Sequence, residues 1–202
     1  MKRILYRSAA LLLLLCILLC AIGCSKSASA EKLDLEKAEM SELCGYVTLG
    51  QYKNMTVKLD GRTKSEAIWS AIRKNADIVK YPETLVKYYE QQARSEYEYY
   101  AEQLDMKYKD VLKKLGTSED EIRAEAERMA VDDLLFELVK RTENISLSDN
   151  DKTEHFDRYV KKYVEDYGYD EEYVRKNLSS EVYDSMLYDK VCEFLIMNND
   201  FN

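Results

Sequence analysis

Apolar residues recur every three or four positions over two long stretches of the chain, which is the spacing of helices with one buried face. The first stretch, residues 82–104, begins with Pro82, and proline is favoured at a helix start because its missing N–H would be unpaired there. The second stretch, residues 119–141, follows a capping-box motif formed by Ser118 and Glu121. The pattern predicts an all-α, elongated domain with two long arm helices. The expected buried stripes are Leu85, Tyr89, Ala93, Tyr97, Tyr100 and Leu104 in the first helix and Ile122, Ala126, Ala130, Leu134 and Leu138 in the second.

Shorter helices and one extended segment are expected in the rest of the domain. Residues 46–59 alternate weakly between apolar and polar positions, which predicts a short extended or strand segment near the N-terminus. Gly116 and Gly168 follow two helical patterns and are typical of helix C-termini, while Ser148 and Asp170 are suited to cap two helix starts. The shorter helices are expected at residues 65–75, at 108–115, at 149–167, after Asp170, and from about residue 180 onward.

The N-terminal residues have the pattern of a secretory signal. Lys2, Arg3 and Arg7 precede an apolar run at residues 9–22. The run is shorter than the ~20 apolar residues that a spanning helix needs, and small and polar residues follow it directly. Residues 1–23 are therefore interpreted as a signal peptide and excluded from the fold.

Two cleavage sites are present after the apolar run. The sequence Ala21-Ile22-Gly23-Cys24 resembles the bacterial lipobox, in which the cysteine is lipidated, and departs from it at Ala21, where that motif usually has leucine. A diacylglyceryl group on Cys24 carries two chains, the number needed for stable anchoring. This interpretation predicts a lipoprotein on the outer face of the bacterial cytoplasmic membrane, with a flexible tether at residues 24–45 and a helical domain at 46–202. The alternative is cleavage after Ala30, which would release a secreted protein.

Charge and cysteine content narrow the choice of partners. Without Lys2, Arg3 and Arg7 the chain has 27 basic and 38 acidic residues, hence a net charge of −11. Such a chain is not expected to bind nucleic acid, which needs clustered basic residues, and it should be repelled by an anionic membrane unless a lipid holds it there. Cys44 and Cys192 are the cysteines that remain after Cys24, and the sequence leaves open whether they pair or stay free.

The sequence contains no pattern that predicts a catalytic, metal or cofactor site. His155 is the single histidine and is expected at the surface of a helix. Motifs of the Cys-x-x-Cys, His-Glu-x-x-His and Gly-x-Ser-x-Gly types are absent from the sequence. Asp149-Asn150-Asp151 lacks the glycine and the terminal glutamate of a calcium loop. The protein is therefore not expected to be an enzyme or to need a cofactor.

Tyrosine is in excess, with 17 residues, most of them between Tyr81 and Tyr188. Tyrosines spread around the first long helix and cannot all face one core. Since a tyrosine ring offers a large apolar face with a polar tip, a surface lined with such rings would hold unfolded segments weakly. The candidate client-binding residues are Tyr88, Tyr99, Tyr100, Tyr108, Met129, Phe156, Tyr159 and Tyr167.

Three segments follow the order that they have in bacterial trigger factor. Residues 48–57, TLGQYKNMTV, resemble the stretch that joins its ribosome-binding and isomerase domains. Residues 68–116, from IWSAIRKN through YPETL to KKLG, look like the start of its C-terminal domain, and residues 117–151, TSEDEIRA to SLSDND, are similar to its long return arm and the turn that follows. The resemblance runs from about residue 47 to the C-terminus. Only about a dozen residues separate Val57 from Trp69, too few for an isomerase domain, and the basic ribosome-docking signature is absent.

The resemblance therefore implies the chaperone part alone, a helical cradle without prolyl isomerisation or ribosome binding. We expect an ATP-independent, holdase-type chaperone for exported, unfolded polypeptides. One alternative is a lipoprotein module that docks a single envelope or secretion partner. A second alternative, a peptidyl-prolyl isomerase, follows from the family label only.

Overall fold

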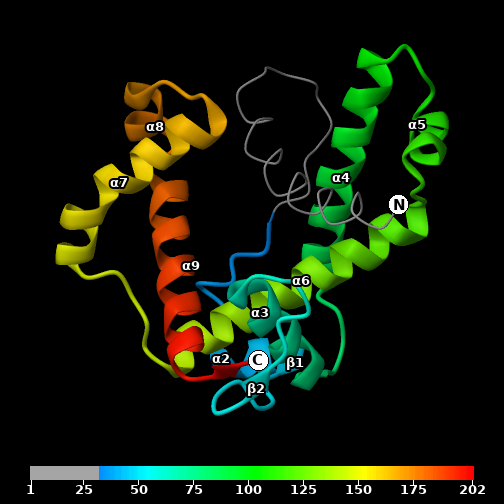
Figure 1. The fold of residues 1–202 in the computed structure, drawn as a ribbon. Helices are drawn as coiled ribbons and strands as arrows, with labels where there is room; N and C mark the ends of the chain where they lie inside the picture. Colours follow the sequence, from blue (N-terminus) through cyan, green and yellow to red (C-terminus); the bar gives the residue numbers. More distant parts are fainter. Residues whose placement is uncertain (1–31) are drawn as a thin grey trace. The chain divides into compact units, whose positions relative to one another are not determined.

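The computed structural model describes residues 32–202, and most of these residues lie in helices (Figure 1). The strands are two residues long, so the prediction of an all-α fold with a short extended segment is confirmed. The chain divides into two compact units: unit 1 contains residues 32–34 and 81–131, and unit 2 contains residues 35–80 and 132–202. The helices are α2 (Met40–Cys44), α3 (Lys64–Asn75), α4 (Glu83–Gln103), α5 (Tyr108–Leu115), α6 (Glu119–Thr142), α7 (Asp149–Tyr167), α8 (Glu171–Asn177) and α9 (Ser179–Met197), and the strands are β1 (Val47–Thr48), β2 (Thr56–Val57), β3 (Asp77–Ile78) and β4 (Asp200–Phe201).

Unit 1 is formed by α4, α5 and the first half of α6. α5 packs against α4, and Gly116 ends α5 in the left-handed conformation that glycine adopts without strain, with φ 72°. Ser118 begins α6 as predicted, because its hydroxyl accepts the backbone N–H of Glu121 at 3.2 Å. The buried side chains of the unit include Leu85, Val86, Glu96, Ala101, Val111, Leu112, Ile122, Ala126, Ala130 and Val131.

The buried face of α4 differs from the expected stripe at its C-terminal end. Leu85 is fully buried as expected, but Leu104 is 50% exposed. The helix stops at Gln103, so helical spacing no longer directs the residue that follows. Glu96 and Ala101 are buried instead, each 6% exposed. The prediction for this helix was therefore correct at its start and wrong at Leu104.

A group of ion pairs joins α4 to α6 within unit 1. The Arg123 guanidinium on α6 lies 3.0 Å from Glu83 and 3.3 Å from Glu90, both on α4. It also lies 3.1 Å from Glu127, one turn further along α6. These groups are partly exposed, so water screens each pair and its contribution to stability is small. The shared arginine fixes the register of the two helices, and the buried apolar side chains supply most of the packing free energy.

The body of unit 2 joins segments that are far apart in the sequence. β1 pairs with β3 in antiparallel fashion, and β2 pairs with β4 in parallel fashion. The Asn199 side chain supports the second pair: its carbonyl accepts the Met55 N–H at 2.8 Å, and its amide donates to the Tyr52 carbonyl at 3.0 Å. α3 lies against α9 and β2 and buries Ile68 and Ile72.

Helices α7, α8 and α9 form a further hydrophobic core within unit 2. α7 packs along both α8 and α9 (Figure 1). Ser148 caps α7 together with Asp151, and Gly168 ends this helix with φ 71°. Asp170 caps α8 by accepting the Tyr173 N–H, so the predicted caps are confirmed. The buried members of this core are Tyr159, Val160, Tyr163, Val174, Leu178, Val182 and Met186.

The N-terminal segment joins unit 2 earlier than the sequence suggests. Residues 24–45 are expected as a tether, but Leu35 is only 9% exposed and Leu43 is fully buried. Leu43 belongs to α2, which is followed directly by β1. Leu35 and Leu43 therefore hold this segment against the core, while the charged residues between them stay exposed.

Arg141 of α6 fastens this segment to the body. Its guanidinium donates three hydrogen bonds of 2.6, 2.7 and 2.8 Å to main-chain carbonyl oxygens. The acceptors are Leu35, Glu36 and Ala38. Glu137, which is 4% exposed, lies 2.6 Å from the same guanidinium and orients it. A buried ion pair and a set of charge-assisted hydrogen bonds therefore fix the point at which the chain enters unit 2.

Replacing Arg141 with alanine is expected to release residues 35–38 and to leave the Glu137 carboxylate with one partner fewer. We expect a loss of about 1–3 kcal/mol in the free energy of unfolding in urea, the usual effect of deleting hydrogen bonds to a charged group, and faster trypsin cleavage after Lys37. Arg175→Ala removes an exposed arginine with two carboxylate partners and should lower the free energy of unfolding by clearly less than Arg141→Ala does. Equal losses in the two variants would contradict the role assigned to Arg141.

Candidate functional site

A row of tyrosine rings covers the junction of α7 and α8 in unit 2. Successive ring centroids along Tyr163, Tyr167, Tyr169 and Tyr173 lie 5.3, 6.2 and 5.7 Å apart. These separations are those of packed aromatic pairs. The left-handed turn at Gly168 ends α7 and allows α8 to begin at once, which brings the four rings together. We call this group the tyrosine row.

The tyrosine row runs from the core to the surface. Tyr163 is 4% exposed, and its hydroxyl lies 3.0 Å from the Glu181 carbonyl and 2.8 Å from the Ser185 hydroxyl. The other three rings are half-buried. Burial raises the pKa of Tyr163 and of Tyr167, so these phenols are uncharged at neutral pH. The outer part of the row presents half-exposed aromatic faces with hydroxyl groups at their tips.

Phe156 and Tyr159, two further candidates on α7, have different surroundings. The Phe156 ring packs 5.1 Å from the Tyr183 ring and lies 5.9 Å from the Arg175 guanidinium carbon. Tyr159 is 8% exposed and donates its hydroxyl hydrogen to Asp189 at 2.6 Å. Burial raises the pKa of Tyr159 to about 12. Tyr159 is thus a core residue that joins α7 to α9, and its burial leaves little of the ring for a client.

The candidate tyrosines of α4 form two separate pairs in unit 1. The Tyr88 and Tyr89 rings meet edge-on with centroids 5.3 Å apart. The Tyr99 and Tyr100 rings lie 6.2 Å apart. Tyr99 is 39% exposed, while the other three rings are half-buried. These pairs are about three helical turns apart, so α4 offers two small aromatic surfaces.

The remaining candidates of unit 1 lie on α5 and α6. Tyr108 begins α5, and its half-buried ring lies 5.5 Å from the Arg94 guanidinium carbon. Burial raises the pKa of Tyr108 to about 12. Met129 is half-buried on α6. Leu104 and Leu115, which are 50% and 58% exposed, were not among the candidates, because each falls at a position where helical spacing indicates burial.

A stacked aromatic trio in unit 2 was also absent from the candidate residues. Trp69 of α3, Phe136 of α6 and Tyr188 of α9 have ring centroids 5.9–6.4 Å apart, and Tyr188 is 42% exposed. The Trp69 indole N–H donates to the buried Cys192 sulfur at 3.2 Å. Cys192 and the exposed Cys44 are both free thiols, which settles the open question of their pairing. Tyr188 completes the trio from the solvent side.

Glu96 is a buried carboxylate beside the tyrosines of α4. It is 6% exposed, and burial raises its pKa, while a hydrogen bond with Tyr100 acts in the opposite direction. Burial and the Glu96 charge in turn raise the pKa of Tyr97 and Tyr100. The helical spacing of the sequence did not indicate that Glu96 is buried, because a charged side chain at such a position is normally assigned to the solvent-exposed face of a helix. Its ionised form opposes the packing of unit 1.

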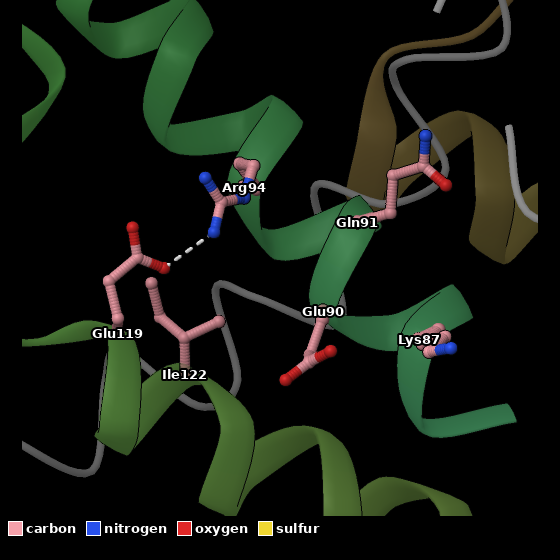
Figure 2. Close-up of a pocket in the computed structure, with 6 residues that line it drawn as sticks. All are labelled: Lys87, Glu90, Gln91, Arg94, Glu119 and Ile122. Carbon is pink, nitrogen blue, oxygen red and sulfur yellow. Dashed lines mark hydrogen bonds and ion pairs between the residues drawn. The ribbon is translucent and has the colours of Figure 1, made fainter. Parts of the chain in front are cut away.

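A charged recess of about 330 Å³ lies between α4 and α6 in unit 1 (Figure 2). The Arg94–Glu119 ion pair, with a separation of 2.8 Å, crosses it. Among residues 32–202 no group of three His, Cys, Asp or Glu side chains is arranged to hold a metal ion. The recess presents charged side chains of both signs and a single aliphatic one, so the aromatic surfaces are the better candidates for holding apolar segments. Its lining residues are Lys87, Glu90, Gln91, Arg94, Glu119 and Ile122.

The predicted lipidation site, Cys24, and the alternative cleavage site at Ala30 lie outside the described residues. So do residues 1–23, the predicted signal peptide. In the part of the chain that is described, the helices are either too short or too polar to cross a bilayer. The membrane anchor therefore stays a prediction from the sequence.

The fold is an all-α domain with long helices and half-buried aromatic rings at its surface. A family profile described as bacterial trigger factor protein (TF) C-terminus matches residues 52–197. The chain belongs to this family, and the matched part is the chaperone part of trigger factor, not its isomerase domain. Comparisons with curated proteins and with solved structures give no significant match.

Glu96→Gln is expected to stabilise the protein at neutral pH, because the neutral amide keeps the shape without the unfavourable burial of charge. A raised pKa means that Glu96 contributes stability that is fully present below its unfolded value of about 4.3 and is lost as pH rises through the folded value. The urea midpoint of the variant should exceed that of the parent at neutral pH and approach it below pH ~4. Glu98→Gln, at an exposed site on the same helix, should change nothing. A less stable Glu96→Gln variant at neutral pH would contradict this account.

Proposed function

We propose that this protein is a membrane-anchored holdase, an ATP-independent chaperone for unfolded polypeptides at the outer face of the bacterial cytoplasmic membrane. The observation that carries the proposal is the match of residues 52–197 to the chaperone part of trigger factor. The half-buried aromatic residues support it. A ring with a polar tip binds many different segments at a low entropic cost, as a chaperone without sequence preference requires.

Client segments would bind by several shallow contacts at once. The tyrosine row on α7 and α8 places four packed rings in succession within unit 2 and offers their faces to apolar segments. The Tyr99–Tyr100 pair and the exposed Leu104 supply further contacts in unit 1. Weak sites on one molecule raise each other's effective concentration, so modest single affinities add up to a useful residence time. No step requires a nucleotide or a covalent intermediate.

The anchor would set where the chaperone works. A lipidated Cys24 is followed by ten residues, 25–34, before Arg141 fixes the chain at Leu35. Ten extended residues span at most about 35 Å, so unit 2 would stay within that distance of the lipid surface. A client that emerges from the membrane would meet the binding surfaces before it could diffuse away.

The tyrosine row is tested by replacing Tyr169 and Tyr173 with serine in the mature chain. The concentration needed to halve the aggregation of a denatured model protein should rise roughly five- to tenfold, as the loss of two weak aromatic contacts predicts. The matched control replaces both residues with phenylalanine, which keeps the aromatic faces and should preserve activity. Circular dichroism establishes that each variant is folded. A parent chain that does not suppress aggregation at several-fold molar excess would overturn the proposed function.

Crosslinking with mass spectrometry in the native host separates the proposed function from its rival. Many unrelated exported proteins should be captured. One recurrent partner in stoichiometric amount would instead favour a module that docks a single envelope or secretion complex.

The anchor is tested by replacing Cys24 with serine. The parent protein should fractionate with membranes and carry the mass of a diacylglyceryl group on its N-terminal cysteine, whereas Cys24→Ser should lose both properties. Cys44→Ser, at an exposed cysteine of the folded part, should behave like the parent. A mature N-terminus at Glu31 would show cleavage after Ala30 and contradict the anchor.

A further inference from the structure

The outer face of α5 is a cluster of lysines in a chain that is acidic as a whole. Lys107 precedes this helix, and Lys109, Lys113 and Lys114 lie within it. All four are exposed. Asp110 is the single acidic residue among them in the sequence. The segment therefore has a local charge of opposite sign to the net charge of the chain. We call these four residues the lysine face.

The packing of α5 explains why the lysines face outward. Val111 is fully buried and Leu112 is 5% exposed, so one side of this short helix is fixed against the unit. The lysines occupy the remaining positions. Lys109 and Lys113 are four residues apart, and Lys107 and Lys114 are seven apart. Residues at either spacing lie on the same side of a helix. Burial of the apolar side therefore determines the exposure of the charged side.

The charges of the lysine face are unpaired. Among residues 32–202, no carboxylate lies within ion-pair distance of these four ammonium groups, and the Lys114 ammonium is placed 4.0 Å from the Met106 sulfur. The arginines of the same unit behave differently: Arg94 is paired with Glu119, and Arg123 has three carboxylate partners. The ion pairs of unit 1 are thus made by its arginines, whereas the lysines of α5 have no carboxylate partner among the described residues.

We infer that the lysine face docks on the anionic headgroups of a membrane surface. The inference rests on the proposed function, since the anchor at Cys24 is what would bring the chain to the membrane. The acidic chain as a whole is repelled by an anionic surface, and the lysine face is the part that is attracted. An anchored molecule with this asymmetry turns α5 toward the lipid. Leu115, which follows Lys114 and is 58% exposed, adds an apolar side chain that the headgroup region accepts.

Charge complementarity alone also fits an acidic polypeptide, but the membrane is the better partner. A free acidic chain is repelled by the net charge of the whole molecule. An anionic membrane surface also repels the chain, but the tether keeps the chain close to that surface. A small local attraction is then enough to decide the orientation of the molecule. The two chains of the anchor would hold the molecule at the membrane by themselves, so the lysine face only has to orient it.

The test couples the mature chain, with Cys44→Ser, through Cys24 to maleimide lipids in vesicles. The rate at which an amine-reactive reagent modifies each lysine is then measured by mass spectrometry. On vesicles that are one-third phosphatidylglycerol, Lys109 and Lys113 should react about threefold or more slowly than on neutral phosphatidylcholine vesicles. The protection should disappear near 1 M salt, where the Debye length falls to about 3 Å. Lys161 and Lys162 of α7 should react equally on both surfaces.

A second measurement uses variants of equal charge. The hydrogen-exchange rate of the Tyr108 amide on α5 is compared on the anionic and the neutral vesicles. Replacing all four residues of the lysine face with glutamine should abolish the difference in this rate between the two vesicles. The matched control replaces Lys58, Lys161, Lys162 and Lys176, which are also exposed, and should retain the difference.

Equal rates on both vesicles for the parent would overturn the inference. So would protection by polyglutamate in solution without protection by the anionic vesicles, which would assign the face to an acidic polypeptide. Suppression of aggregation in solution does not depend on these lysines, so failure here is distinct from failure of the holdase proposal.

Discussion

The apolar stripe of α6 is the constraint on which the rest of the structure depends. This helix of 24 residues buries Ile122 and Ala130 in unit 1 and Leu134 and Leu138 in unit 2. One helix therefore supplies core side chains to both units, and each unit completes its interior with few other elements. A small unit buries a smaller share of its surface than a large one does. Half-buried residues follow from this, and tyrosine suits such positions because its ring packs inward while its hydroxyl reaches water.

The helices could be predicted from the sequence because their ends are set by local chemistry. α5 was expected at residues 108–115 and is observed at Tyr108–Leu115, since Gly116 stops it. The same holds for α7, between its serine cap and Gly168. The pairing of β2 with β4 could not be predicted, because strands of two residues carry no periodic pattern and their partners are far apart in the chain. The entry of Leu35 into the core was also missed, because Arg141, which holds its carbonyl, lies 106 positions away on α6.

The candidate site was predicted less completely than the fold. Helical spacing selected Tyr167, but Tyr169 and Tyr173 join it only through the turn at Gly168, which a periodic pattern does not describe. Spacing also cannot tell which side of a helix a neighbour covers, and Tyr159 proved to be a core residue for this reason. From the sequence only the net charge of the chain was considered, whereas the structure distinguishes, in the part of the chain that it describes, basic side chains that have a carboxylate partner from those that have none. The aromatic surfaces and the lysine face thus differ in chemistry: one presents neutral rings, the other an uncompensated charge.

The parallel pairing of β2 with β4 has a consequence for the order in which the chain folds. Met55 is hydrogen-bonded to Asn199 across 144 positions, so the body of unit 2 stays incomplete until residues 198–202 are available to pair. α4 and α5, which contact each other within a short span of sequence, can assemble before that point. For that interval the protein is itself a partly folded polypeptide. A copy that has already matured would find in each newly arriving copy a substrate of the kind it is proposed to hold.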